Sequence, residues 1–239
     1  MPTTMETYPR AELLVEPDWL AAHLDDANLR VIDCDQPELA AARGHIQGAV
    51  TLPIHPYFRD WETGVGVATA AQAEQILRGL GVSNTTHVIC YDSQGGLLAA
   101  RVWWVLWHYG HDNAALLNGG WQGWDAAGLP TSRAWATPPS GDFTADQHDD
   151  RIASCDVLLP QLGGGDLLPL DVRDDLEWSG GKPAPNATNL REGRIPGAIH
   201  LEWRAFVDWE HDTRFKPAGE LERILQEAGV DRGKRVVPY

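Results

Sequence analysis

Cysteine, basic residues and long apolar runs are all scarce in this sequence. Its three cysteines cannot form an even-numbered disulfide framework, and no two of them have the Cys-x-x-Cys spacing of zinc and redox motifs. The 19 Lys and Arg against 34 Asp and Glu give a formal net charge of −15, which disfavours nucleic acids and anionic membranes as partners. The apolar runs fall far short of the ~20 residues that span a bilayer, and the polar start of the chain does not resemble a signal peptide. We therefore expect a cytoplasmic protein.

The most informative feature that is present is an internal repeat of domain size. A Gly-x-Ile-x-Gly-Ala block occurs at Gly44 and again at Gly193, 149 residues later. Each block follows an aspartate and precedes a helical stretch and a strand that ends in tyrosine. Because solenoid units are only about 20–50 residues long, this repeat indicates the duplication of a whole domain. We expect one domain at residues 11–130, a Pro-, Ser-, Thr- and Asp-rich linker at 131–150, and a second domain at 151–239. The paired aspartates are Asp33 and Asp171, and the paired tyrosines are Tyr91 and Tyr239.

Short apolar runs alternate with helical patterns along the chain. The runs do not alternate with polar residues, as the strands of a half-exposed sheet would, so we expect buried parallel strands. Strands that alternate with helices indicate an α/β fold, with a parallel sheet in each domain and helices on both faces. The expected strands are residues 30–34, 87–91, 113–117 and 167–172, and the expected helices include residues 11–30, 70–80 and 97–109.

One loop between a strand and a helix has the geometry of an anion site. It reads Cys90-Tyr91-Asp92-Ser93-Gln94-Gly95-Gly96. A loop that leads into a helix N-terminus points backbone N–H groups at an anion, and it would favour the thiolate of a cysteine in the first loop position. Asp92 occupies that position here, so we interpret Asp92 as a structural, helix-capping residue. The alternative is a nucleophilic aspartate of a phosphoryl-transfer enzyme, but no Lys or Ser/Thr set for phosphate and Mg²⁺ follows it.

These spaced elements resemble the rhodanese family of thiosulfate and 3-mercaptopyruvate sulfurtransferases in its two-domain form. In that family the first domain commonly lacks the cysteine and often has aspartate in its place, as Asp92 does. The second domain carries the nucleophile directly after a Val-Val-x-Tyr strand, which here is Val236-Val237-Pro238-Tyr239. The family's cysteine would directly follow Tyr239, so we expect a truncated second domain and no activity from residues 1–239 alone. The resemblance also rests on Asp33, Gly44-His45-Ile46-Gln47-Gly48-Ala49, Arg101-Val102-Trp103-Trp104, Gly110-His111, Asn118-Gly119-Gly120-Trp121, Asp171-Val172-Arg173 and Gly193-Arg194-Ile195-Pro196-Gly197-Ala198.

The resemblance implies a reaction and a set of substrate-binding residues. A sulfane sulfur would pass from thiosulfate or 3-mercaptopyruvate, through a cysteine persulfide, to a thiol or cyanide-like acceptor, without a metal or organic cofactor. Arg173 would approach the anionic group of the donor, because the forked donors of a guanidinium stay charged at any working pH. The alternative for Arg173 is an exposed ion pair with a nearby acidic residue, Asp174, Asp175 or Glu177. The other residues implied at the substrate pocket are Arg191, Trp203, Leu97 and Leu98, although a structural role is open for each of them.

Two other hypotheses remain open at this point. The chain could be a non-catalytic, rhodanese-like binding or regulatory module, or a phosphatase-like relative that uses a related cysteine loop. The second fits less well, because such proteins are usually single-domain. We expect Cys34 and Cys90 to lie in strands and to be unreactive, and Cys155 to be more accessible. His108 and His111 have no evident third ligand, so a metal site there is not expected.

Overall fold

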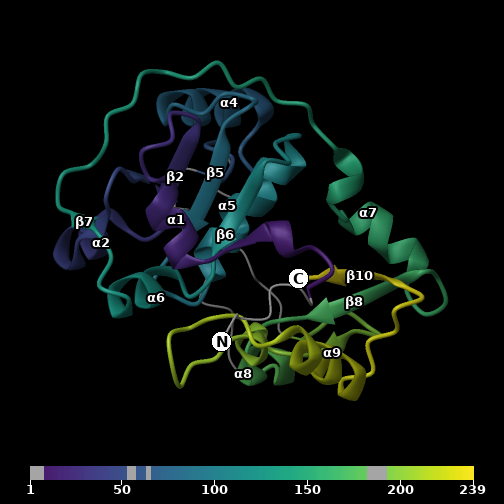
Figure 1. Cartoon of the computed structure of the whole chain (residues 1–239). Helices are drawn as coiled ribbons and strands as arrows, with labels where there is room; N and C mark the ends of the chain where they lie inside the picture. The colour runs from purple at the N-terminus through teal and green to yellow at the C-terminus, as the bar shows by residue number, and fades with distance from the viewer. Residues whose placement is uncertain (1–7, 53–57, 63–65, 182–192) are drawn as a thin grey trace. The chain divides into compact units, whose positions relative to one another are not determined.

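The computed structural model describes residues 8–52, 58–62, 66–181 and 193–239, which form two compact units (Figure 1). The first unit consists of Pro9–Arg151 together with Asp208–Phe215, and the second of Ile152–Val207 and Lys216–Tyr239 with Tyr8. Among the described residues, no helix is both long and apolar enough to cross a membrane.

The first unit is built on a parallel five-stranded sheet of order β1-β6-β5-β2-β4. The two faces of its strands pack against different helices. In β5, Val88 and Cys90 join a core with the side chains of α4 and α5, while Ile89 and Tyr91 join a second core with those of α1 and α6. The elements are β1 (Leu14–Val15), α1 (Pro17–His23), β2 (Leu29–Asp33), α2 (Pro37–Arg43), β3 (His45–Ile46), β4 (Val50–Thr51), α4 (Ala70–Gly79), β5 (His87–Tyr91), α5 (Leu97–His108), β6 (Ala114–Leu117), α6 (Gly120–Ala126) and β7 (Thr131–Ser132).

The expected strands and helices of this unit are largely confirmed, with one exception. The predicted helix over residues 11–30 is wrong, because the helix α1 covers only Pro17–His23. Leu14–Val15 instead pairs with β6 as the edge strand β1, and β2 already begins at Leu29. Pro17 stands in the first turn of α1, where its missing N–H is not needed. Because Leu14 and Val15 are held in the sheet by their pairing with β6, the helix begins only after them.

Residues 131–150, in which we expected a linker, pack along the first unit. β7 pairs with β3 in antiparallel fashion. Farther on, Phe143 is fully buried in the core that contains α4 and α5, and its backbone N–H donates to the Val82 carbonyl at 3.2 Å. This stretch has no helical or strand periodicity because its contacts come from single buried residues and backbone hydrogen bonds.

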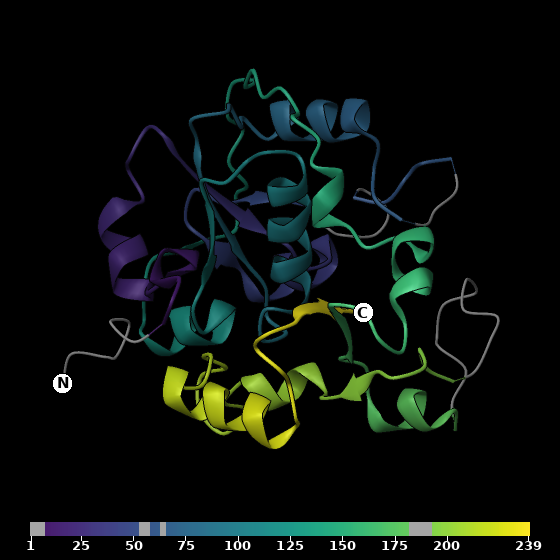
Figure 2. The same cartoon turned by 90° about the vertical axis from the view of Figure 1, so that its right-hand side faces the viewer.

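The second unit has a parallel three-stranded sheet of order β10-β8-β9. Strand β8 corresponds to β2, β9 to β4 and β10 to β5, as the internal repeat predicts. Figure 2 shows these elements in a second orientation, with α8 in green and α9 in yellow. The elements are α7 (Cys155–Leu158), β8 (Leu167–Asp171), α8 (Asp175–Ser179), β9 (Ile199–His200), α9 (Ala218–Glu227) and β10 (Arg235–Pro238), with a short 3₁₀ helix at Trp203–Phe206. Residues 182–192 of this unit lie outside the described residues.

Asp208–Phe215 lies among the contacts of the first unit, although it comes from the second half of the chain. The Thr213 hydroxyl donates to the Gly119 carbonyl at 3.0 Å, and the Phe215 N–H donates to the Asn118 side chain at 2.9 Å. Arg214 forms an ion pair with Glu16. No sequence pattern predicted this position for the segment.

Candidate functional site

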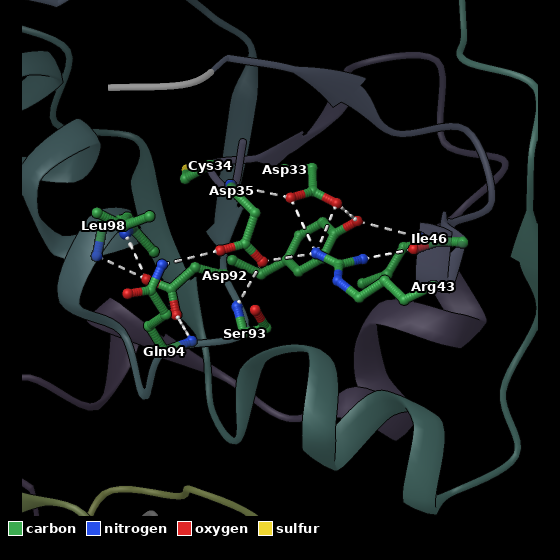
Figure 3. Close-up of polar contacts among 12 residues, drawn as sticks. Asp33, Cys34, Asp35, Arg43, Ile46, Asp92, Ser93, Gln94 and Leu98 are labelled. Atoms are coloured by element: carbon green, nitrogen blue, oxygen red, sulfur yellow. Dashed lines mark hydrogen bonds and ion pairs between the residues drawn. The ribbon is translucent and has the colours of Figure 1, made fainter. Parts of the chain in front are cut away.

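A buried polar frame lies where β2 and β5 end in the first unit (Figure 3). Tyr91, the last residue of β5, donates from its hydroxyl to Asp33 at 2.6 Å and accepts from the Ile46 N–H at 3.1 Å. Arg43, the last residue of α2, donates from Nη2 to both Asp33 oxygens at 3.0 and 3.1 Å, and its Nη1 donates to the Gly44 carbonyl. This frame ties the Gly-x-Ile turn to the carboxyl ends of two neighbouring strands.

The Asp92 side chain fills the loop that follows β5. Its Oδ1 accepts from the N–H groups of Gln94 and Gly96, each at 2.8 Å. Its Oδ2 accepts from Leu98 at 2.7 Å and Ala99 at 2.8 Å, in the first turn of α5. Burial raises the pKa of Asp92, and the N–H donors act in the opposite direction. These contacts agree with the interpretation of Asp92 as a capping residue, and they show four backbone donors converging on one anion.

A third carboxylate, that of Asp35, was missed in the sequence interpretation. Its Oδ2 accepts from the Ser93 N–H at 2.8 Å and from Arg43 Nη2 at 2.7 Å, and its Oδ1 accepts from the Gln94 side chain at 3.3 Å. Asp33, Asp35 and Asp92 are all fully buried, and Arg43 contacts the first two. The signal that could have identified Asp35 is its position in the repeat, where it corresponds to Arg173.

The second unit repeats the frame at the end of β10. The Tyr239 hydroxyl accepts from the Ile195 N–H at 3.0 Å and hydrogen-bonds with Asp171. Here the guanidinium belongs to Arg173, whose Nε and Nη2 donate to the two Asp171 oxygens at 2.9 and 2.5 Å and whose Nη2 also donates to the Gly193 carbonyl at 3.0 Å. The frame therefore has the same parts in both units, but its arginine comes from a different place in the sequence.

The two strand-end aspartates differ in the direction of their pKa shifts. Burial raises the pKa of Asp33, and the charge of Arg43 only partly offsets this. Burial also acts to raise the pKa of Asp171, but the hydrogen bonds from Arg173 outweigh it, so that the pKa of Asp171 lies below its ordinary value. The arginine of the second frame therefore outweighs the effect of burial on its aspartate, whereas the arginine of the first frame does not.

The residues that the resemblance placed at a substrate pocket lie in both units. In the second unit, Arg173 pairs with Asp171 and not with the exposed acidic residues considered above, and its side chain is 22% exposed. Trp203, in the same unit, is half-buried, and its backbone N–H donates to the Val172 carbonyl. In the first unit, Leu97 is 43% exposed at the start of α5, and Leu98 packs against the core. Arg191 lies outside the described residues. The substrate-binding role of all five stays a prediction.

None of the three cysteines stands in the first position of a loop like that of Asp92. Cys34 and Cys90 are fully buried, and burial raises the pKa of the Cys34 thiol well above its ordinary value. Cys155 is exposed and begins α7. Within the part of the chain that the structure describes, no group of three or more His, Cys, Asp or Glu side chains could hold a metal ion.

Comparisons with known proteins agree with this architecture. Residues 16–127 match the family described as Rhodanese-like domain. A putative thiosulfate sulfurtransferase of Mycolicibacterium smegmatis is 32% identical over 241 residues, which covers 96% of this chain and 83% of the relative. The sulfur carrier protein TtuD of Thermus thermophilus is 31% identical, with 97% of this chain and 83% of the relative covered.

A solved structure matches over both units' sequences. The 3-mercaptopyruvate sulfurtransferase SseA from Escherichia coli aligns with a TM-score of 0.80 at 28% identity, over 95% of this chain and 87% of SseA. The repeat, the parallel sheets and these relatives lead to the same result. The chain belongs to the rhodanese family of sulfurtransferases, in its form with two tandem rhodanese-like domains.

Proposed function

We propose that this protein transfers a sulfane sulfur from a small anionic donor, thiosulfate or 3-mercaptopyruvate, to a thiol or cyanide-like acceptor through a cysteine persulfide. The observation that carries the proposal is the second frame, in which Arg173, Asp171 and Tyr239 surround the carboxyl end of β10. The corresponding strand of the first unit is β5, and after its end Asp92 is held in a cradle of four N–H donors. Such a cradle stabilises a thiolate or persulfide as well as a carboxylate, since each is an anion.

The proposed chemistry needs no cofactor, because its electrons balance within the reactants. A cysteine thiolate attacks the outer sulfur of thiosulfate, a new S–S bond forms, and sulfite leaves with the electron pair of the old bond. With 3-mercaptopyruvate, the C–S bond breaks and the enolate of pyruvate leaves and takes up a proton. The acceptor then attacks the outer sulfur of the persulfide and releases the cysteine thiolate.

We propose that the nucleophile is a cysteine directly after Tyr239, the position that corresponds to Asp92. Cys34 and Cys90 are fully buried, and Cys155 starts the four-residue helix α7, outside any loop of this type. Residues 1–239 alone are therefore expected to lack turnover. A non-catalytic binding module is the competing hypothesis, and it predicts that no cysteine follows Tyr239.

We also propose that Arg173 meets the anionic group of the donor. Its Nε and Nη2 are engaged with Asp171 and the Gly193 carbonyl. Its Nη1 makes none of the hydrogen bonds found among the described residues, and the side chain is partly exposed. Nη1 is thus the atom of this guanidinium that can donate to a sulfonate or carboxylate.

Two measurements test the function. In the gene, a cysteine codon directly after the Tyr239 codon, followed by a Gly-containing loop, supports the proposal, and a natural stop codon there contradicts it. In a thiocyanate assay with either donor and cyanide, residues 1–239 should give no product above a buffer control, whereas the chain with the cysteine should turn over and lose turnover on its replacement by serine. Turnover by residues 1–239 that disappears with Cys155→Ser would assign the reaction to a different cysteine.

A further inference from the structure

The two units carry opposite charges at one equivalent backbone position. In the first unit, the N–H of Asp35 donates to Asp33 Oδ1 at 3.1 Å; in the second, the N–H of Arg173 donates to Asp171 Oδ1 at 3.1 Å. The residue between them donates in each case to the carbonyl of the frame tyrosine, Tyr91 or Tyr239. We call the site of Asp35 and Arg173 the paired position. The fold places this position identically in the two units, so only the side chain differs.

In the first unit, the paired position adds negative charge beside the loop that follows β5. Asp35 accepts from the N–H of Ser93, the residue next to Asp92, at 2.8 Å. Its charge adds to burial in raising the pKa of Asp92 and of Asp33. Three buried carboxylates thus surround the loop and the frame, with Arg43 as the guanidinium in contact with two of them.

In the second unit, the paired position supplies the cation itself. The Arg173 guanidinium lies 5.4 Å from the centroid of the Tyr239 ring, as the Arg43 guanidinium lies 5.8 Å from that of Tyr91. Arg173 therefore occupies the place of Arg43, and no described carboxylate of the second unit corresponds to Asp35. Among the residues that the structure describes, the frame of the second unit contains one carboxylate, that of Asp171, and one guanidinium, that of Arg173.

We propose that the charge at the paired position determines which unit can hold a thiolate at the first position of its loop. Asp35 disfavours a thiolate in the first unit even if a cysteine replaces Asp92, and Arg173 favours one in the second; this second half rests on the proposed function. The physical reason is that an adjacent like charge disfavours an anion, whereas an adjacent guanidinium favours it. Among the described residues, the charged and titratable groups near this loop in the first unit are Asp33, Cys34 and Asp35 from β2 and the turn after it, Arg43 from α2, and, beside Gly119, Arg214 with its two carboxylate partners Asp212 and Glu16.

The test places a cysteine in the first unit and titrates it. In a Cys155→Ser background, Asp92→Cys is compared with Asp92→Cys/Asp35→Asn by the ultraviolet absorbance of the thiolate as a function of pH, after subtraction of the background protein. The matched control is Asp92→Cys/Asp26→Asn, because Asp26 is exposed and lies before β2, at the opposite end of this strand. We expect Asp35→Asn to lower the titration midpoint by roughly 1–2 pH units, and Asp26→Asn to leave it nearly unchanged.

Equal midpoints in the three proteins, or a shift with Asp26→Asn as large as that with Asp35→Asn, would overturn the proposal. If Asp92→Cys does not fold, as judged by circular dichroism, the Asp92 carboxyl is titrated by ¹³C NMR instead, in the parent and in Asp35→Asn. Its pKa should then fall in the variant, and an unchanged pKa overturns the proposal. These experiments need no turnover and probe only residues of the first unit within the whole chain. Their failure would leave the sulfur-transfer proposal standing, and failure of the turnover assay would not affect them.

Discussion

Replacing Arg43 by alanine would leave the carboxylates of Asp33 and Asp35 buried without their cation. Arg43 Nη2 lies 3.0 Å from Asp33 and 2.7 Å from Asp35, both carboxylates are fully buried, and the Arg43 side chain is only 12% exposed. The guanidinium also lies 4.3 Å from the centroid of a Trp121 ring, so its loss also removes packing in the core. Removal of one partner from a buried ion pair costs about 3–5 kcal/mol, because the remaining charge stays desolvated. We expect Arg43→Ala to destabilise the first unit by about this amount at pH 7.

The measurement is urea unfolding followed by tryptophan fluorescence, since Trp121 lies against Arg43. The control is Arg10→Ala, which removes an arginine from an exposed pair with Glu12, where the two side chains are 58% and 63% exposed. Such pairs contribute about 0–1 kcal/mol. A loss below about 1 kcal/mol for Arg43→Ala, or one no larger than that of the control, would refute the reasoning.

The pH dependence of the same variant tests its electrostatic cause. Without the cation, the folded-state pKa of Asp33, already raised by burial, rises further above its unfolded value of about 3.9. An acid whose folded-state pKa is raised loses stability as the pH rises through the interval between its unfolded and folded pKa values. The difference between parent and variant should therefore be smaller at about pH 4 than at about pH 7. A difference that stays constant or grows in acid would show that lost packing, and not charge, is responsible.

Two further substitutions test the second frame and the Asp92 loop. In the chain that carries the proposed cysteine, Arg173→Ala should lower kcat/KM for the anionic donor by the equivalent of roughly 2–4 kcal/mol, and Arg173→Lys should restore only part of this loss. The control is Arg194→Ala, which changes a nearby exposed arginine. Unchanged kinetics for Arg173→Ala would place this guanidinium away from the donor. Gly120→Ala should cost about 1–3 kcal/mol in urea unfolding, because Gly120 has φ +51° and a Cβ there would lie 2.4 Å from the Asp92 carbonyl oxygen. Gly79→Ala, where a Cβ meets nothing within 4 Å, should be nearly neutral, and equal losses at the two glycines would contradict this account.

Much of the fold could be predicted because it depends on local patterns. The unbroken apolar run His87–Tyr91 indicated a buried parallel strand, and the structure gives the reason, since its alternate residues pack into two different cores. Helix α4 followed from periodicity, and Thr69 caps its N-terminus in a capping box with Gln72. The short edge strand Leu14–Val15 was missed, because two residues carry no periodicity and their pairing with β6 is a long-range contact.

The order of residues in the chain was sufficient to identify the duplication, the parallel α/β class, the family, and Asp92 in place of a cysteine, because each of these is written in spacing and residue type. The partners of the buried charges were not predictable in this way. Arg43 reaches Asp33 across ten residues and Arg173 reaches Asp171 across two, yet both guanidinium groups occupy the same place beside a frame tyrosine. An ion pair of this kind depends on which side chain the packed helices and turns bring next to the buried carboxylate. The separation of two residues in the sequence does not determine how close their side chains lie in the fold. The charge beside the Asp92 loop, and the place of each frame's guanidinium, are therefore properties of the folded chain.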